Sequence, residues 1–251
     1  MIPRRTIVEI AANSLKSAIA AEQGGADRVE LCEFLEGGGV TPSFGTIAYT
    51  RDKLNIPLHV LIRPRVGDFY YGEEELEIML RDISICHQLA CDGVVIGALD
   101  REGNIDRELC LRLIETAGDM RLVFHRAFDC VTDQERNWSI LKELGIQNIL
   151  SSGAANTAIE GAEQLAAWVR THPEIQFMAG AGVNAKNVAA LIDQTGVAAV
   201  HASCRSPVQS GATARKIAGL EMGYWETELT LVQALVAAVR DADQSAAFKT
   251  P

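Results

Sequence analysis

The sequence predicts an α/β fold of a single domain, a TIM (β/α)8 barrel of the usual length of about 250 residues. Eight short apolar segments alternate with segments of helical character. The apolar segments begin about 20 to 36 residues apart, which leaves room for a crossover helix between parallel strands. They are hydrophobic on both faces, as buried parallel strands are. The alternative is an open doubly wound sheet, but no GxGxxG motif follows the first segment.

The predicted elements follow in order along the chain. The strands are Thr6–Ala11, Arg28–Cys32, Leu58–Arg63, Gly93–Leu99, Arg121–Ala127, Asn148–Ser152, Gln176–Ala181 and Ala198–Ser203. Residue types that cap helix N-termini stand between these strands. They predict helix starts at Ser14, Asp106, Asp133, Asn156 and Asn184.

No break in composition divides the chain, so the barrel is predicted to span residues 1–241. Its last helix is expected at Glu226–Arg240, and the small residues of 242–251 predict a flexible C-terminal tail. The segment Arg205–Trp225 is rich in Gly and Ser and too long for a turn between a strand and a helix. We expect it to be a lid or an interface loop.

Charge and cysteine content narrow the class of protein. The net charge is -10, and no cluster of Lys and Arg forms a patch, which argues against nucleic acid as a partner. No apolar run is long enough to span a membrane. The six cysteines include no CxxC pair. These features predict a cytoplasmic protein with reduced thiols that binds a small molecule or a metal ion.

Polar residues on the strands share one face. Because side chains alternate along a strand, these residues should point into the barrel while their apolar neighbours face the helices. Buried charges need a partner, so the set should form an internal ion-pair network or hold a ligand. The set consists of Glu9, Arg28, Glu30, His59, Arg63, His125 and His201.

Charged residues gather at the C-terminal ends of the strands, where barrels of this kind carry their active sites. His125, with Asp129 or Asp100, would supply an acid and a base. His125 should face the barrel axis and Arg126 the opposite face of the strand, unless the strand has already ended there. Deeper polar residues add further catalytic candidates, and three arginines could clamp an anion. The deeper candidates are His59 and Glu30, and the three arginines are Arg63, Arg65 and Arg126.

A second anion signal lies at the end of the seventh predicted strand. Gly180 and Gly182 precede a predicted helix, so backbone N–H groups could approach a phosphate at its N-terminus. His201 and Ser203 end the next strand beside it. The same glycines would also suit a tight turn without a ligand.

Several motifs together resemble the CutC copper homeostasis family. They are Gly25–Cys32, Glu36–Gly38 with Thr41–Ser43, Ile62–Arg65 with Gly67–Phe69, and Phe124–Asp129. The resemblance extends over nearly the whole chain and implies a TIM barrel, a cytoplasmic location, a relation to copper and a homodimer or homotetramer.

Copper binding, as the resemblance implies it, depends on thiols, because Cu(I) prefers soft ligands. Some members of the family carry a cysteine at the end of the first strand that could share an ion with the cysteine of the second. In this chain Ala11 stands at that place, which leaves Cys32 as the metal candidate.

Three functions therefore stand beside one another. The chain is a copper-handling protein, a barrel enzyme that acts on a small sugar- or phosphate-bearing anion, or a scaffold whose oligomer surface is its function. The polar strand ends suit the enzyme, since a copper carrier needs only two thiols.

Overall fold

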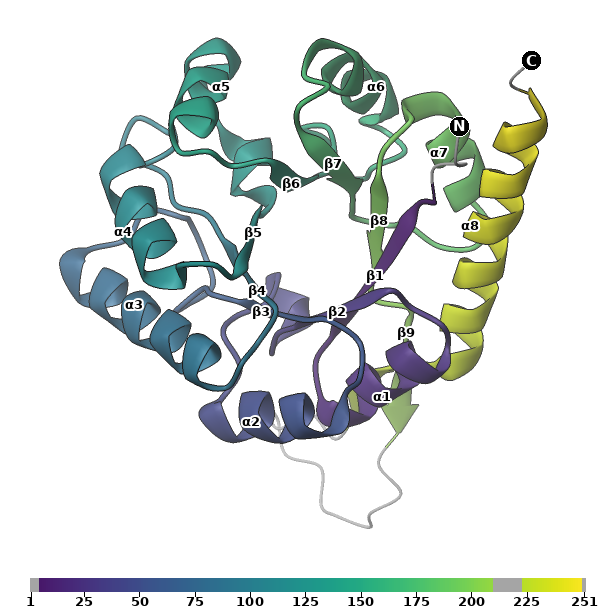
Figure 1. Cartoon of the computed structure of the whole chain (residues 1–251), viewed down its shortest axis with the longest axis horizontal. Coiled ribbons are helices and arrows are strands. Elements are labelled where there is room, and N and C mark those ends of the chain that lie inside the picture. The colour runs from purple at the N-terminus through teal and green to yellow at the C-terminus, as the bar shows by residue number, and fades with distance from the viewer. Residues whose placement is uncertain (1–4, 210–222, 250–251) are drawn as a thin grey trace.

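The computed structural model describes residues 5–209 and 223–249, and its centre is a closed barrel of eight parallel strands. The strands pair in sequence order, and β8 pairs with β1 to close the barrel. Figure 1 shows the helices as an outer ring around the strands. The predicted TIM barrel is confirmed. The strands are β1 Ile7–Ala12, β2 Arg28–Leu31, β3 Leu58–Leu61, β4 Gly93–Ile96, β5 Arg121–Phe124, β6 Asn148–Ser151, β7 Gln176–Ala179 and β8 Ala199–Ala202.

Eight α-helices cover the described part of the barrel. They are α1 Leu15–Gln23, α2 Phe44–Lys53, α3 Glu73–Gln88, α4 Arg107–Ala117, α5 Gln134–Glu143, α6 Ala162–Thr171, α7 Val188–Thr195 and α8 Leu229–Lys249. Two short 3-10 helices, η1 Leu35–Gly37 and η2 Arg126–Cys130, follow β2 and β5. Among the described residues, no helix is long and apolar enough to cross a membrane.

Three of the predicted helix starts are confirmed by their capping hydrogen bonds. The side chains of Ser14, Asp106 and Asp133 each accept a backbone N–H from the first turn of α1, α4 and α5. Each bond satisfies one of the N–H groups that a helix N-terminus leaves without a partner.

The predicted starts at Asn156 and Asn184 are wrong, because local side-chain bonds form separate turns there. The Asn184 side chain accepts the backbone N–H of Lys186, and the backbone N–H of Asn184 donates to the side chain of Asn187. As a result, α7 begins only at Val188. Ahead of α6, Thr157 and Glu160 bond each other's backbone N–H groups in the same way.

The C-terminal helix is longer than predicted. Residues 242–249, expected as a flexible tail, continue α8. Asp243 on this helix accepts the backbone N–H and the hydroxyl of Thr6 at 2.9 and 2.6 Å, which fastens α8 to the start of the barrel.

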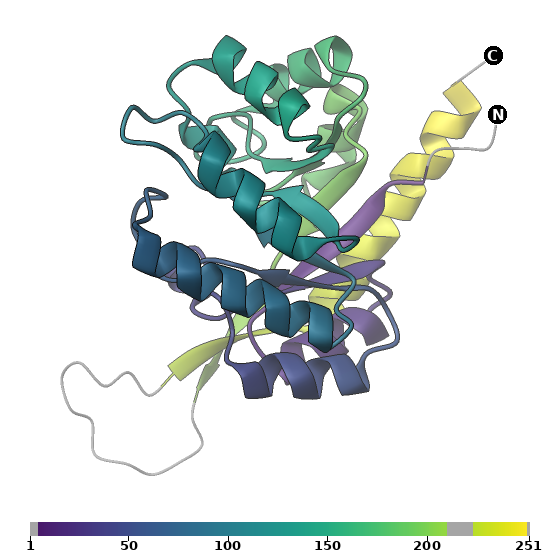
Figure 2. The same cartoon turned by 60° about the vertical axis from the view of Figure 1, so that its left-hand side comes forward.

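The segment expected as a lid or interface loop begins and ends in strands. β9 (Arg205–Gln209) and β10 (Gly223–Thr227) pair antiparallel, and the hairpin extends away from the barrel (Figure 2). Residues 210–222 of the predicted loop lie outside the described residues, so its role stays a prediction.

The polar residues of the first three strands meet inside the barrel, as their alternation predicts. Glu9 is fully buried and forms an ion pair with Arg28 from the neighbouring strand, while His59 Nδ1 lies 3.5 Å from the Glu9 carboxylate. Burial alone would raise the pKa of Glu9, but Arg28 and His201 hold it well below its usual range. This layer of the barrel is therefore an internal charge network. Apolar side chains fill much of the remaining interior, among them Leu61, Val95, Val123, Leu150 and Met178.

Buried His59 predicts a dependence of stability on pH. Burial lowers its pKa from 6.5 to about 4, an effect that Arg28 reinforces and Glu9 opposes. The unfolded chain therefore takes up this proton before the folded chain does, so the free energy of unfolding falls as the pH drops from 6.5 to about 4. The full effect is roughly 3 kcal/mol.

Urea unfolding of the wild type and His59→Gln at about pH 7 and about pH 5 measures this contribution. The wild type should lose more free energy of unfolding than the variant over this range. Equal losses in the two proteins would contradict a neutral, buried His59.

Candidate functional site

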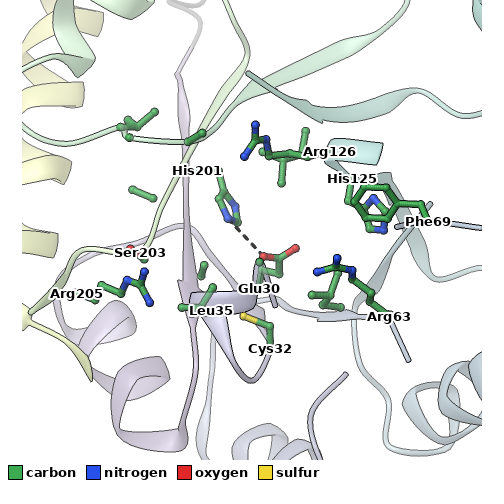
Figure 3. A pocket seen from close by; sticks show the side chains of 18 residues that line it. Glu30, Cys32, Leu35, Arg63, Phe69, His125, Arg126, His201, Ser203 and Arg205 are labelled. Atoms are coloured by element: carbon green, nitrogen blue, oxygen red, sulfur yellow. Dashed lines mark ion pairs between the residues drawn. The ribbon is translucent and has the colours of Figure 1, made fainter. Parts of the chain in front are cut away.

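A pocket of about 380 Å³ opens at the C-terminal ends of the strands, where the barrel fold predicts a site. Its walls come from the ends of every strand except β4 and from several of the loops that follow them. Figure 3 shows the polar side chains converging on its interior. The sequence-predicted residues that line it are Glu30, Cys32, Arg63, His125, Arg126, Gly182, His201 and Ser203.

Five other predicted site residues lie outside this pocket. His59 is buried in the charge network below it, and Gly180 donates its N–H to Ser151 in the neighbouring strand. Arg65 pairs with Glu75 at 2.6 Å and also donates to the backbone of the loop after β3. The last two, Asp100 and Asp129, have their oxygens engaged by loop atoms.

Both of these aspartates stabilise turns rather than face the pocket. Asp100 accepts the N–H groups of Glu102 and Asn104. Asp129 accepts the N–H of Ser152 at 3.0 Å and the Ser152 hydroxyl at 2.9 Å, which fixes the loop after β6. A carboxylate that already accepts several donors in this way is poorly placed to act as a base.

The end of β5 differs from its prediction. The strand ends at Phe124, and η2 begins at Arg126. The turn brings Arg126 to the pocket, where it lies beside His125 instead of on the opposite face of the strand. Arg126 donates to Asp129 at 2.8 Å and to Ser152 at 2.9 Å, so most of its charge is already paired.

His125 is held in a single orientation. Its Nδ1 accepts the backbone N–H of Ala127 at 3.1 Å, which caps η2. Gly97 allows the ring to approach β4, because a Cβ there would lie 2.5 Å from the His125 Cε1. The ring of Phe69 lies 5.0 Å from the imidazole, centroid to centroid. Burial and the Arg63 cation lower the pKa of His125 to about 3, so the imidazole is neutral near pH 7.

Arg63 is a buried cation without an anionic partner among the described residues. Its guanidinium donates to the carbonyls of Gly37, Gly39 and Gly67 at 2.7–3.1 Å. Its Cζ lies 4.9 Å from the centre of the Phe69 ring. Tyr71 offers no compensating charge, since burial raises the pKa of its phenol to about 12.

Glu30 and His201 form an acid–base pair in the wall of the pocket. His201 Nε2 lies 3.4 Å from Glu30, and its Nδ1 lies 2.8 Å from Glu9 (Figure 3). Burial raises the pKa of Glu30 to about 7, with His201 opposing and Glu9 reinforcing the shift. Burial alone would lower the pKa of His201, but Glu30 and Glu9 outweigh it and raise that pKa.

The predicted anion site at the end of β7 has a different form from the one expected. It is not a helix N-terminus, since α7 begins at Val188. Ala181, Gly182 and Val183 instead line the pocket, and their backbone N–H groups donate to no described residue. Ala181 and Gly182 both have a φ of 76°, in the left-handed region.

Sequence reasoning missed two side chains in the pocket wall. Arg205 was assigned to a long loop, but it begins β9 and pairs with Glu36 at 2.8 Å. Phe69 entered the sequence analysis only as the end of the Gly67–Phe69 motif. Arg205 follows Ser203 by two residues, and this spacing was the one available signal that it faces the same pocket.

The thiols do not form a metal centre in the described part of the chain, where no group of three or more His, Cys, Asp and Glu side chains is placed to hold an ion. Cys32 is buried, and burial raises the pKa of its thiol well above the usual value. The strand register pairs Ala11 with Glu30, so Ala11 is diagonal to Cys32 and brings no second sulfur. These donors do not fit Cu(I), which prefers soft thiolates.

The sequence of this chain is similar to those of known proteins. The CutC family profile matches residues 6–206. A CutC protein of Xanthomonas campestris is 48% identical over 94% of this chain and 99% of its own length. The copper homeostasis protein cutC homolog of Mus musculus is 36% identical over 94% of this chain and 90% of its own.

Two solved structures are also similar to this chain. CutC of Streptococcus agalactiae is 35% identical, with a TM-score of 0.75 over 79% of this chain and 98% of that one. Phosphoribosyl anthranilate isomerase of Thermotoga maritima has a TM-score of 0.61 over 94% of this chain and 99% of that one, but at 12% identity it shares the fold alone. The family match and the identities together establish that this chain belongs to the CutC family.

Proposed function

We propose that the protein is an enzyme whose mouth pocket binds a small organic anion and moves a proton on it. The observation that carries the proposal is Arg63, a cation nine-tenths buried that pairs with no carboxylate among the described residues. A buried charge is costly unless an opposite charge accompanies it. An anionic ligand in the pocket would supply that charge, with charge-assisted hydrogen bonds.

The opposite wall supports the same ligand class. The amides of Ala181, Gly182 and Val183 are donors without acceptors in the described chain, and Ser203 adds a hydroxyl beside them. Donors of this kind suit the oxygens of a phosphate or carboxylate group. A pocket of about 380 Å³ is the size of a small metabolite site.

The Glu30–His201 pair supplies the chemistry. A carboxyl group whose pKa lies near 7 is present in both protonation states at neutral pH, which is the condition that general acid–base catalysis requires. Glu30, one of the deeper catalytic candidates from the sequence, takes the role expected of Asp100 or Asp129, because those two aspartates are held in turns.

Copper remains the second candidate, on the strength of the family's name and of Cys32 in the pocket wall. Bound copper would be cargo rather than a catalyst on this reading. A single buried thiol is a weak basis for Cu(I) selectivity. The cytoplasmic location and the homodimer or homotetramer that the resemblance implies stay predictions.

Replacement of Arg63 should weaken anion binding. Arg63→Met removes the buried cation, so the dissociation constant for 2-phosphoglycolate should rise roughly 10- to 100-fold. Isothermal titration calorimetry measures it. Arg65→Met is the matched control, since Arg65 lies two residues away and outside the pocket. Equal affinity in wild type and Arg63→Met, with both proteins folded by thermal melting, would sink the proposal.

Anion binding should strengthen as the pH falls. The Glu30 carboxylate repels a bound anion, and it becomes protonated as the pH drops through about 7. Sulfate is a suitable probe, because it does not itself titrate between about pH 8 and about pH 6. Its dissociation constant should decrease over that range in the wild type and change much less in Glu30→Gln. The reverse pH trend in the wild type would contradict this assignment.

Cu(I) binding should not depend on Cys32. We expect the wild type and Cys32→Ser to release Cu(I) alike to the chelator bathocuproine disulfonate, because one thiol with a raised pKa makes a poor Cu(I) site. A sharp fall in Cu(I) affinity in Cys32→Ser alone would instead restore copper as the cargo of this pocket.

A further inference from the structure

His125 presents a buried hydrogen-bond donor that nothing in the described chain accepts. Because Nδ1 accepts the Ala127 N–H, the ring proton of the neutral imidazole resides on Nε2. That Nε2 is buried and has no hydrogen-bond partner among the described residues. Buried donors are almost always satisfied in folded proteins. A ligand atom in the pocket that His125 lines would satisfy this one.

Phe69 brings His125 and Arg63 to the same side of the pocket. The imidazole and the guanidinium both lie about 5 Å from its ring, at 5.0 and 4.9 Å. Arg63 supplies the cation, and His125 stays neutral because burial and this adjacent cation lower its pKa. One cationic and one neutral donor thus share a wall, and no acidic side chain of the described residues accepts from both.

The Glu30 carboxylate lines the same pocket as these donors. Figure 3 shows it between His201 and the Arg63 side chain. A carboxylate base that faces two donors is the arrangement that stabilises an enolate: the base removes a proton from carbon while the donors hold the oxygen on which charge develops. A neutral imidazole serves this role in known proton-abstracting enzymes.

Resting on the proposed function, we infer that the pocket enolises a small α-hydroxycarbonyl compound that bears a phosphate or carboxylate group. Arg63 and the His125 Nε2–H hold the carbonyl oxygen, and the amides of residues 181–183 hold the anionic group. Glu30 takes the proton from the carbon next to the carbonyl.

The step balances without a cofactor. The C–H electron pair becomes the new C=C bond, and the carbonyl π pair moves onto the oxygen that the two donors hold. The proton on Glu30 can return to the carbon that it left, which restores the substrate. For the carbonyl to move along the chain, the proton of the α-hydroxyl first passes to the adjacent enolate oxygen. The Glu30 proton then adds to the former carbonyl carbon while the C=O bond forms at the neighbouring carbon. A Schiff-base route has no amine available among the described residues, since none of the residues that line the pocket there is a lysine.

Two ligands with the same phosphate group test the inference. Phosphoglycolohydroxamate resembles an enediolate, whereas ethyl phosphate carries the phosphate group without a carbonyl or carboxylate oxygen. The hydroxamate should bind the wild type at least roughly 100-fold more tightly, as transition-state analogues do. His125→Leu should abolish most of this preference, because ethyl phosphate has no oxygen at the place that the His125 Nε2–H would hold. His125→Gln, which keeps a side-chain N–H donor, should restore part of it.

Each result separates the two proposals. Equal binding of the two ligands to the wild type would overturn enolisation and leave anion binding intact. A preference for the hydroxamate that persists in folded His125→Leu would overturn the role of His125. Failure of both ligands to bind the wild type would overturn the proposed function itself, and this inference with it.

Discussion

The ion pair between Glu9 and Arg28 is the interaction on which the polar interior of this barrel depends. Glu9 is fully buried, and an isolated carboxylate there would be too costly to remain charged. Arg28 keeps it ionised, and the charged Glu9 then raises the affinity of His201 for a proton. His201 lies beside Glu30 in the wall of the pocket, so the protonation state of His201 determines the charge next to the Glu30 carboxyl group. A residue deep in the fold thereby influences the chemistry at the mouth.

The interior divides into two levels with different charge balance. In the lower level, Glu9 and Arg28 form an ion pair, and the buried His59 Nδ1 has no hydrogen-bond partner among the described residues. In the upper level, no described carboxylate pairs with Arg63, and the His125 Nε2 donates to no described residue. A buried cation without an anionic partner favours a binding site over a purely structural network in the upper level. The thiols show no comparable lack of partners. Cys32 is buried, and burial raises the pKa of its thiol, so the thiol stays protonated. The neighbouring strand offers Ala11 there rather than a second sulfur.

Much of the candidate site could be predicted from the sequence, and the predictions that were wrong share one cause. Alternation along the strands correctly grouped Glu30, Arg63, His125 and His201 on the inner face, because that period of two is a local property of extended chain. Beyond the last ladder bond, the period no longer applies. The capping bond of His125 turned Arg126 into the pocket, and turn hydrogen bonds withdrew Asp129 from it.

The sequence by itself determined the barrel, because eight apolar segments separated by helix-length connections can bury their backbone groups in few other ways. It also determined which strand residues face inward. Only the tertiary structure decided which buried polar groups have hydrogen-bond or ion-pair partners and which have none. That outcome depends on contacts between residues far apart in the chain, such as Glu9 with His201 and Arg63 with Gly37. Burial then shifted the pKa of Glu30 toward neutrality, a change that no local sequence pattern encodes.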